Sequence, residues 1–235
     1  MLADLSLSGW RPVPAVRSLL LRTGRRVPAK RLASLRSALG YLELGALVES
    51  LYADVPLVEC SDRFGVFAEA LRAIRGVAPL YLEFGVYEGE TISWWSENLL
   101  GTKAHLVGFD SFEGLPEDWR PGFSAGAFRT QGPPDVKDPR VAFVAGWFEN
   151  TIPNYQPPLH DQLIINIDSD LYSSARTVLE WAAPRLVTGS LLYFDELSDR
   201  DHELRALQEL LATTDIQLCP LAYALGGRHF LFRVD

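Results

Sequence analysis

The sequence is poor in cysteine and contains no long apolar run, and these two absences narrow the class of protein. Its 235 residues include only Cys60 and Cys219, which form neither a CxxC pair nor a Cys/His metal spacing. A disulfide-stapled scaffold and a structural zinc site are therefore excluded, and two buried, reduced thiols are expected. The apolar run at 19–21 is too short for a signal-peptide core, and no stretch approaches the ~20 residues of a membrane span. We expect a cytoplasmic protein.

The chain also lacks the surplus of basic residues that nucleic-acid binding requires. Its formal net charge is −8, whereas neutralising phosphates needs an excess of Lys and Arg. The charge is uneven, because residues 1–40 carry eight basic residues and one acidic residue, against 14 basic and 29 acidic residues in the remainder. Prolines 12, 14 and 28 interrupt any long amphipathic helix in this basic arm. We expect a surface arm or an oligomer contact there rather than a transit peptide.

Short apolar runs alternate with helical patterns along the rest of the chain. Helices are expected at 30–52, with a possible break at Gly40, and at 62–75, 91–100, 173–186 and 202–211; strands are expected at 79–85, 105–109, 141–144, 162–167, 190–194, 216–222 and 229–234. Strands separated by helices pair in parallel through right-handed crossovers. The last two strands leave no room for a helix between them, so they should pair antiparallel at the end of the sheet. The sequence predicts an α/β fold: a Rossmann-like, doubly wound, mostly parallel sheet with a C-terminal antiparallel strand pair and an N-terminal helical extension.

A long segment between Asp110 and Arg140 carries no clear helix or strand pattern. It is rich in Gly, Pro and aromatic residues, including Trp119, Phe123 and Phe128. Loops of this length in a compact domain are usually functional or mobile. We interpret the segment as a lid that faces the substrate, with a simple insertion as the alternative.

The residues at the strand ends are the candidates for chemistry, because ligands bind outside the carboxyl ends of parallel strands. Glu83 ends the strand at 79–85, and Gly85 and Gly89 follow it in the spacing of a tight turn before a helix. The third glycine of a dinucleotide fingerprint is missing, so an NAD enzyme fits poorly. Asp110 ends the next strand, where a carboxylate can accept both hydroxyls of a ribose. A purely structural strand–turn–helix is the alternative interpretation.

Four more acids follow two later strands. Asp168 and Asp170 come after the strand at 162–167, and Asp195 and Glu196 follow the strand at 190–194. With no Lys or Arg near them, four converging carboxylates would repel one another, and a bound divalent cation would resolve the conflict. Oxygen ligands favour Mg²⁺, Mn²⁺ or Ca²⁺. One acid would then remain as a general base; the alternative is that these acids cap the helices that follow.

Taken together, the motifs resemble class I S-adenosylmethionine-dependent methyltransferases, and among them the metal-dependent sugar O-methyltransferases of the macrocin O-methyltransferase type. The resemblance rests on LEFGVYEGETI (82–92), VGFDSFEGLPE (107–117), VAGWFENTIP (144–153), NIDSDLY (166–172) and YFDE (193–196). It implies a methyltransferase domain over residues 58–235, preceded by a basic arm and helices over residues 1–57 that act as a lid or oligomer contact.

The resemblance also implies a role for each matching residue. The methionine moiety of S-adenosylmethionine would lie near Glu83, Gly85, Tyr87, Gly89 and Thr91, the ribose near Asp110 and Ser111, and the adenine near Gly146 and Trp147. Asp168, Asp195 and Glu196 fall on the positions of the Mg²⁺ (or Mn²⁺) ligands, and Asp170 on the position of the general base. Glu196 departs from the usual pair of aspartates, which puts its direct ligation in doubt. His202 is an alternative base.

The expected function is the Mg²⁺-dependent methylation of a sugar hydroxyl in a glycoside, a saccharide or a natural product. A catechol or phenolic O-methyltransferase with the same cofactor and metal is one alternative, and a degenerate methyltransferase fold that serves as a binding module is another. We expect a small-molecule or saccharide partner, no nucleic acid, no membrane span, and a homodimer or larger homo-oligomer.

Overall fold

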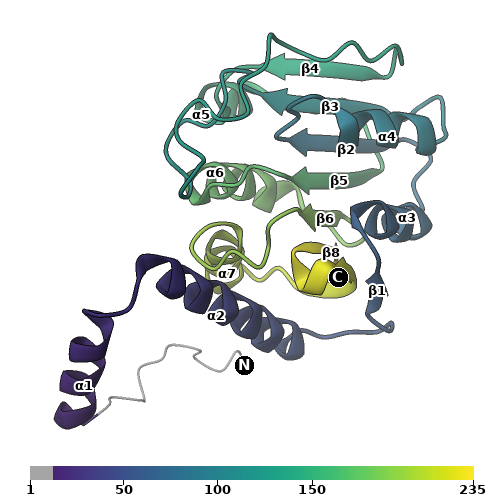
Figure 1. The fold of residues 1–235 in the computed structure, drawn as a ribbon. Helices are drawn as coiled ribbons and strands as arrows, with labels where there is room; N and C mark the ends of the chain where they lie inside the picture. The colour runs from purple at the N-terminus through teal and green to yellow at the C-terminus, as the bar shows by residue number, and fades with distance from the viewer. Residues whose placement is uncertain (1–12) are drawn as a thin grey trace.

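An eight-stranded sheet forms the centre of the described part of the chain, residues 13–235 of the computed structural model (Figure 1). Residues 1–12, which include Arg11 and Pro12 of the basic arm, lie outside the described residues. The strands are β1 (Val58–Cys60), β2 (Pro79–Phe84), β3 (His105–Asp110), β4 (Val141–Ala145), β5 (Gln162–Ile167), β6 (Leu191–Phe194), β7 (Leu218–Ala224) and β8 (His229–Val234). Their spatial order is β1-β7-β8-β6-β5-β2-β3-β4, and every pairing is parallel except those of β8 with β6 and β7.

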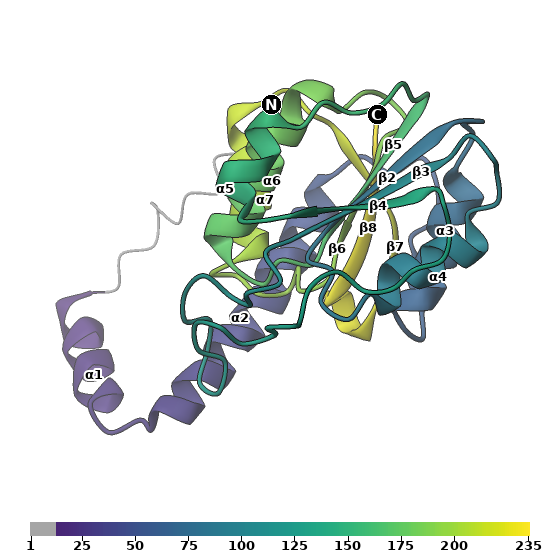
Figure 2. The ribbon, with the colours of Figure 1, turned by 90° about the horizontal axis from the view of Figure 1, so that it is seen from above.

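Helices cover both faces of this sheet, as Figure 2 shows. One face carries α5 (Phe148–Thr151), α6 (Tyr172–Ala182) and α7 (Glu203–Thr213), and the other carries α3 (Arg63–Ala73) and α4 (Glu90–Asn98). Two N-terminal helices, α1 (Pro14–Gly24) and α2 (Ala29–Ser50), precede them, and α1 projects away from the rest (Figure 1). Short 3₁₀ turns span Ile152–Asn154, Ala183–Arg185 and Leu225–Gly227. This is the predicted α/β fold with an N-terminal helical extension.

Burial on both faces explains why the central strands read as continuous apolar runs. Every residue of β2 and β5 is buried, which is what parallel strands covered by helices on both sides require. On one face Tyr81 stacks on Trp95 of α4 at 4.6 Å, and on the other Phe84 stacks on Phe109 at 4.8 Å. Burial of each such side chain stabilises the fold by about 1.5–3 kcal/mol. The sheet therefore provides a rigid base for its strand ends.

Two sequence-based expectations need correction, one about the sheet and one about the cysteines. The antiparallel pair β7–β8 exists, but it does not lie at the end of the sheet, because β1 pairs in parallel with β7 and forms the edge. The three residues of β1 are too few to give a periodic signal. Both cysteines are free thiols, but only Cys219 is buried, and Cys60 is partly exposed.

The predicted break at Gly40 is also wrong, because α2 runs through it without interruption. Gly40 is instead required by close packing: a Cβ atom at this position would lie 2.2 Å from the backbone oxygen of Ser198, in the loop after β6. The buried side chains Leu44 and Leu47 follow on the same helix, and Glu43 pairs with Arg200 at 2.7 Å. The N-terminal extension thus packs directly against the loop that continues from the acids after β6.

Over the described residues, no helix has the length and apolarity needed to cross a bilayer.

We predict that Gly85→Ala destabilises the protein much more than Gly122→Ala. Both glycines have a positive φ, +100° and +97°, so backbone strain costs each variant about 1–2 kcal/mol. A Cβ atom on Gly85 would also lie 1.8 Å from the backbone oxygen of Asp168, whereas Gly122 has no atom within 4 Å of its Cβ position. Forcing β2 and β5 apart should add about 1–3 kcal/mol. Urea denaturation of the two variants measures the difference, and equal losses of stability would contradict this account of the turn.

Candidate active site

A cavity of about 720 Å³ opens at the carboxyl ends of the parallel strands. Its walls come from the residues after β2, β3, β4, β5 and β6 and from the segment 111–128. This is the position at which open α/β sheets bind ligands. The volume is in the range of small-molecule and cofactor sites.

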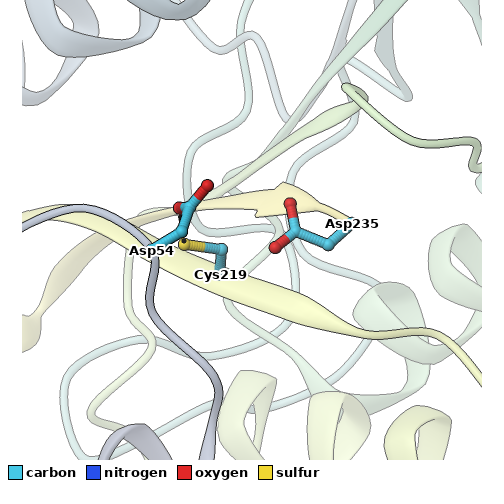
Figure 3. A group of neighbouring side chains, drawn as sticks. All are labelled: Asp54, Cys219 and Asp235. Atoms are coloured by element: carbon cyan, nitrogen blue, oxygen red, sulfur yellow. Dashed lines mark hydrogen bonds between the residues drawn. The ribbon is translucent and has the colours of Figure 1, made fainter.

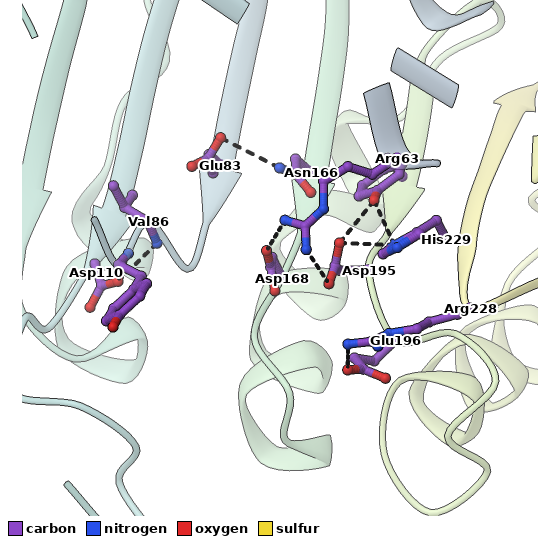
Figure 4. A network of polar contacts seen from close by, with 12 residues as sticks. Arg63, Glu83, Val86, Asp110, Asn166, Asp168, Asp195, Glu196, Arg228 and His229 are labelled. Carbon is purple, nitrogen blue, oxygen red and sulfur yellow. Dashed lines mark hydrogen bonds and ion pairs between the residues drawn. The ribbon is translucent and has the colours of Figure 1, made fainter. Parts of the chain in front are cut away.

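Asp110 holds together the turn that follows β2. Its Oδ2 accepts the backbone N–H groups of Val86 at 2.8 Å (Figure 4) and Tyr87 at 2.9 Å. Its Oδ1 accepts the backbone N–H of Phe112 at 2.7 Å. The N–H of Gly85 donates to the carbonyl of Phe109 at 3.0 Å. A carboxylate offers about four acceptor positions, so Asp110 keeps one for a ligand hydroxyl while it joins the ends of β2 and β3.

The nine residues that the resemblance places around the cofactor divide into two groups. Gly85, Tyr87, Asp110, Ser111, Gly146 and Trp147 line the cavity, whereas Glu83, Gly89 and Thr91 do not. Gly89 is the N-cap of α4 with φ +81°, and Thr91 is buried inside that helix. Glu90 between them does line the cavity, and the motif gave no reason to select it.

Glu83 lies in the core rather than in the cavity wall. The Tyr81 hydroxyl donates to its Oε2, and the Asn166 amide donates to the Tyr81 hydroxyl at 2.9 Å and to Glu83 Oε2 at 3.4 Å. Burial raises the pKa of Glu83 to about 8, against a partial opposing effect of these hydrogen bonds. The network connects β2 to β5. Glu83, the acid that precedes Gly85 and Gly89 in the sequence, therefore contributes to the packing of the sheet and does not face the cavity.

The four acids after β5 and β6 all line the cavity, as predicted, but the expectation of no nearby arginine is wrong. The guanidinium of Arg63 lies between two of them, 3.9 Å from Asp168 Oδ2 and 3.7 Å from Asp195 Oδ2 (Figure 4). Glu196 pairs with Arg228, and Arg120 lies 3.7 Å from its Oε1.

These arginines were missed because they lie far from the acids in sequence. Arg63 is the first residue of α3, Arg120 belongs to the segment after β3, and Arg228 lies between β7 and β8. Each arginine nevertheless lies in a segment that follows the carboxyl end of a strand: β1, β3 or β7. Ligands bind at this edge of the sheet, so the position of the three arginines in the sequence could have predicted their place in the site.

Asp195 is the most constrained of these acids. Its Oδ1 accepts the Tyr193 hydroxyl at 2.9 Å, and His229 Nδ1 lies 3.0 Å from the same oxygen. Burial opposes ionisation of Asp195, but the hydrogen bond from His229 and the charges of His229 and Arg63 outweigh it, so its pKa is lowered. His229 is itself buried in contact with this acid.

Asp170 differs from its neighbours, because within residues 13–235 its carboxyl forms no hydrogen bond and no ion pair. Its φ of +59° is unusual for a residue with a side chain. Burial and then the charge of Glu196 raise the pKa of Asp170 to about 7. It lines the cavity, so both of its oxygens are available to a ligand.

The alternative that these acids cap helices does not hold. The N-caps of α6 and α7 are Leu171 and His202, and neither helix has a side-chain cap hydrogen bond. His202 Nδ1 accepts the backbone N–H of Tyr172 at 3.1 Å and does not line the cavity. Its proposed role as an alternative base is therefore not supported by its position.

Aromatic residues of the segment after β3 form one wall of the cavity. Trp119, Phe123 and Phe128 all line it, with ring centroids of neighbouring pairs 5.3–6.4 Å apart. The guanidinium of Arg120 stacks on Trp119, 3.6 Å from the ring centroid. The segment therefore faces the cavity, as expected of a lid.

A different group of side chains meets the distance criterion for a metal site. Among the described residues, only Asp54, Cys219 and Asp235 bring three potential ligand atoms within 4.8 Å of one another (Figure 3). Arg233 already pairs with both aspartates, with Asp54 at 2.8 Å and with Asp235 at 2.7 Å, and the group lies outside the cavity. Asp168, Asp195 and Glu196 do not meet the criterion.

Comparisons with known proteins agree with this geometry. Residues 82–197 match the family described as "Methyltransferase domain". A stretch of 59 residues is 37% identical to 8-demethyl-8-(2,3-dimethoxy-alpha-L-rhamnosyl)-tetracenomycin-C 4'-O-methyltransferase of Streptomyces olivaceus. It covers 25% of this chain and 22% of that protein, so the chain matches less than a quarter of that relative's length.

Two solved structures share the fold over most of the chain. The crystal structure of CalS11, described as calicheamicin methyltransferase, has a TM-score of 0.56 at 21% identity and covers 95% of this chain and 86% of its own. The apo structure of CalS11, described as TDP-rhamnose 3'-O-methyltransferase, has a TM-score of 0.50 at 19% identity and covers 95% and 96%. At these identities the likeness establishes the fold alone, and it agrees with the predicted Rossmann-like α/β architecture.

We predict that Glu83→Gln weakens the pH dependence of stability. Because burial raises the folded pKa of Glu83 from 4.5 to about 8, the folded state binds a proton that the unfolded state releases. The wild-type free energy of unfolding therefore falls as the pH rises between these two values. This contribution, on the order of a few kcal/mol, is absent from Glu83→Gln. Urea denaturation at several values of pH within this range measures it.

The exposed Glu97 of α4 provides the control. Glu97→Gln should follow the wild-type pH dependence, whereas Glu83→Gln should lose less stability than either as the pH rises. Parallel curves for all three proteins would mean that Glu83 does not take up a proton on folding.

Proposed function

We propose that this chain, whose residues 82–197 match the methyltransferase-domain family, is an S-adenosylmethionine-dependent O-methyltransferase that acts on a sugar hydroxyl. The observation that carries the proposal is Asp170. Its carboxyl is unpaired, borders the cavity opposite the turn after β2, and has a pKa near neutrality. The relative described as a rhamnosyl 4'-O-methyltransferase supports the sugar acceptor.

The residues that line the cavity fit the cofactor. Gly85 leaves the turn without a side chain, and Asp110 keeps one acceptor position for a ribose hydroxyl. Trp147, half-buried at the start of α5, offers a flat face for the adenine. Glu90 adds a carboxylate at the start of α4 for an amino group. The roles predicted for Glu83, Gly89 and Thr91 become indirect, because these residues support the turn from behind.

The chemistry requires one base and a fixed geometry. S-adenosylmethionine, when bound, supplies a methyl group on a positively charged sulfur. Asp170 would accept the proton of the attacking hydroxyl as the new C–O bond forms and the S–C bond breaks, so that charge and atoms balance. Positioning of the two reactants contributes several kcal/mol in such transfers, and the rigid ends of β2, β5 and β6 provide it here.

The aromatic wall bears on the choice of acceptor. Trp119 and Phe123 can stack on the apolar face of a sugar ring, and they can also stack on a phenol. The polar residues Glu117, Arg120 and Ser173 border the same space, and they suit an acceptor with several hydroxyl groups. The sugar acceptor is therefore favoured over the phenolic alternative.

The Mg²⁺ or Mn²⁺ that the resemblance implies does not enter this mechanism. Asp168, Asp195 and Glu196 do not converge on one point, and each has an arginine partner. Because the donor set does not fit a cation, no step is derived through one. The homo-oligomer, the cytoplasmic location and the division at residue 57 remain predictions from the sequence.

We predict that Asp170→Asn loses methyl transfer but keeps cofactor binding. Removal of a general base typically costs 10²–10⁴-fold in rate, and the amide cannot accept the hydroxyl proton. Since burial and the charge of Glu196 raise the pKa of Asp170 to about 7, kcat/KM of the wild type should rise with pH and level off above this value. Transfer of a labelled methyl group to a panel of glycosides and phenolic diols measures both effects.

The matched control is Asp135→Asn, because Asp135 is exposed, pairs with Lys137 and lies outside the cavity. It should behave as the wild type, and calorimetry should give all three proteins the same affinity for the cofactor. Full activity of Asp170→Asn would remove Asp170 from the mechanism, and transfer to phenols alone would replace the sugar acceptor by the phenolic one.

We predict that Trp119→Ala and Trp147→Ala separate acceptor binding from cofactor binding. Trp119 lies on the aromatic wall and Trp147 lies after β4. Loss of a stacking ring should raise the KM for the acceptor about tenfold in the first variant and the Kd for the cofactor about tenfold in the second. Trp119→Phe should recover most of the first loss. If both variants affect the same ligand, the division of the cavity is wrong.

A further inference from the structure

Three of the four carboxyl groups that follow β5 and β6 have an arginine partner. Arg63, Arg120 and Arg228 lie within 4.0 Å of Asp168, Asp195 and Glu196. All six side chains border the cavity. Positive groups therefore already lie beside these three acids before any ligand binds.

Arg63 lies where a metal ion shared by Asp168 and Asp195 would have to lie. Its Nη1 faces one carboxylate and its Nη2 faces the other, at 3.9 Å and 3.7 Å (Figure 4). The oxygens around an octahedral Mg²⁺ lie only about 3–4 Å apart, because each is about 2.1 Å from the ion. A guanidinium between two carboxylates keeps their oxygens apart and supplies the positive charge itself.

Two further acids, Glu203 and Asp170, lie near this point, and Oε1 of Glu203 is buried without a hydrogen-bond partner. The Glu203 carboxylate accepts the backbone N–H of Glu196 at 3.0 Å and is fully buried. Asp195 also contacts Tyr193 and His229. The unpaired Asp170 is a single carboxylate, and one carboxylate does not form a divalent-cation site without partners.

We propose that the three arginines replace the divalent cation of this site, and that methyl transfer by this protein is independent of metal. Arg63 is a positioning residue that holds Asp168 and Asp195 in place, and Arg120 and Arg228 do the same for Glu196. The inference rests on the proposed function for its catalytic part, whereas its structural part, that the wild-type site does not bind a divalent cation, stands by itself.

Titration of the full-length protein with Mn²⁺, followed by the electron paramagnetic resonance of free Mn²⁺, tests the structural part. The wild type should leave the free signal unchanged. Arg63→Met keeps an unbranched apolar stem and removes the guanidinium, so it should expose Asp168 and Asp195 and bind Mn²⁺ at least about tenfold more tightly than the wild type. Arg72→Met, on the exposed side of the same helix, should behave as the wild type.

Stoichiometric binding of Mn²⁺ by the wild type, lost in Asp195→Asn, would overturn the proposal. The wild-type titration decides this even where Arg63→Met fails to fold, which circular dichroism would reveal. For the catalytic part, addition of a chelator should change the rate of methyl transfer by less than about twofold, whereas a metal-assisted reaction would lose most of its rate. If no acceptor is methylated at all, the proposed function fails, and the Mn²⁺ titration still decides whether the site binds metal.

Discussion

The compensation of buried carboxylates is the constraint on which the rest of this site depends. Parallel strands bring their carboxyl ends to one edge of the sheet, and here β5 and β6 bring Asp168 and Asp195 there together. Two such charges cannot remain close in a poorly solvated site without a partner. Arg63 provides that partner from the start of α3, whose Val66, Phe67 and Ala70 pack in the core, so a helix held by apolar contacts brings the positive charge to the cavity.

The turn after β2 solves a related problem with backbone groups instead of a charged side chain. The N–H groups of Val86 and Tyr87 donate to Asp110, so this carboxylate satisfies backbone groups that the turn would otherwise leave without a partner. The same bonds fix the turn over which a cofactor would lie. At Glu83, in contrast, burial outweighs the hydrogen bonds from Tyr81, Asn166 and the backbone of Ile92 and raises the pKa to about 8.

Sequence reasoning recovers the parts of this structure that depend on local pattern. The buried runs of β2 and β5, the helices between them and the acids at strand ends follow from periodicity and from the rule on parallel sheets. It fails where the answer depends on three-dimensional contacts between distant residues. Arg63 is more than a hundred residues from Asp168 in sequence, and the continuity of α2 through Gly40 depends on the carbonyl of Ser198, which periodicity cannot reveal.

Arg120 shows how the lid and the charged site depend on each other. Its guanidinium stacks on Trp119 at 3.6 Å and on Phe123 at 5.1 Å, and the same group lies 3.7 Å from Glu196. One side chain thus belongs both to the aromatic wall and to the carboxylates after β6. A movement of the segment 111–128 away from the cavity would separate Arg120 from Glu196 and leave Arg228 as the only arginine on that acid among the described residues. The charge balance of the site and the position of the lid are therefore linked, and an acceptor that orders the aromatic wall would also order the acids beneath it.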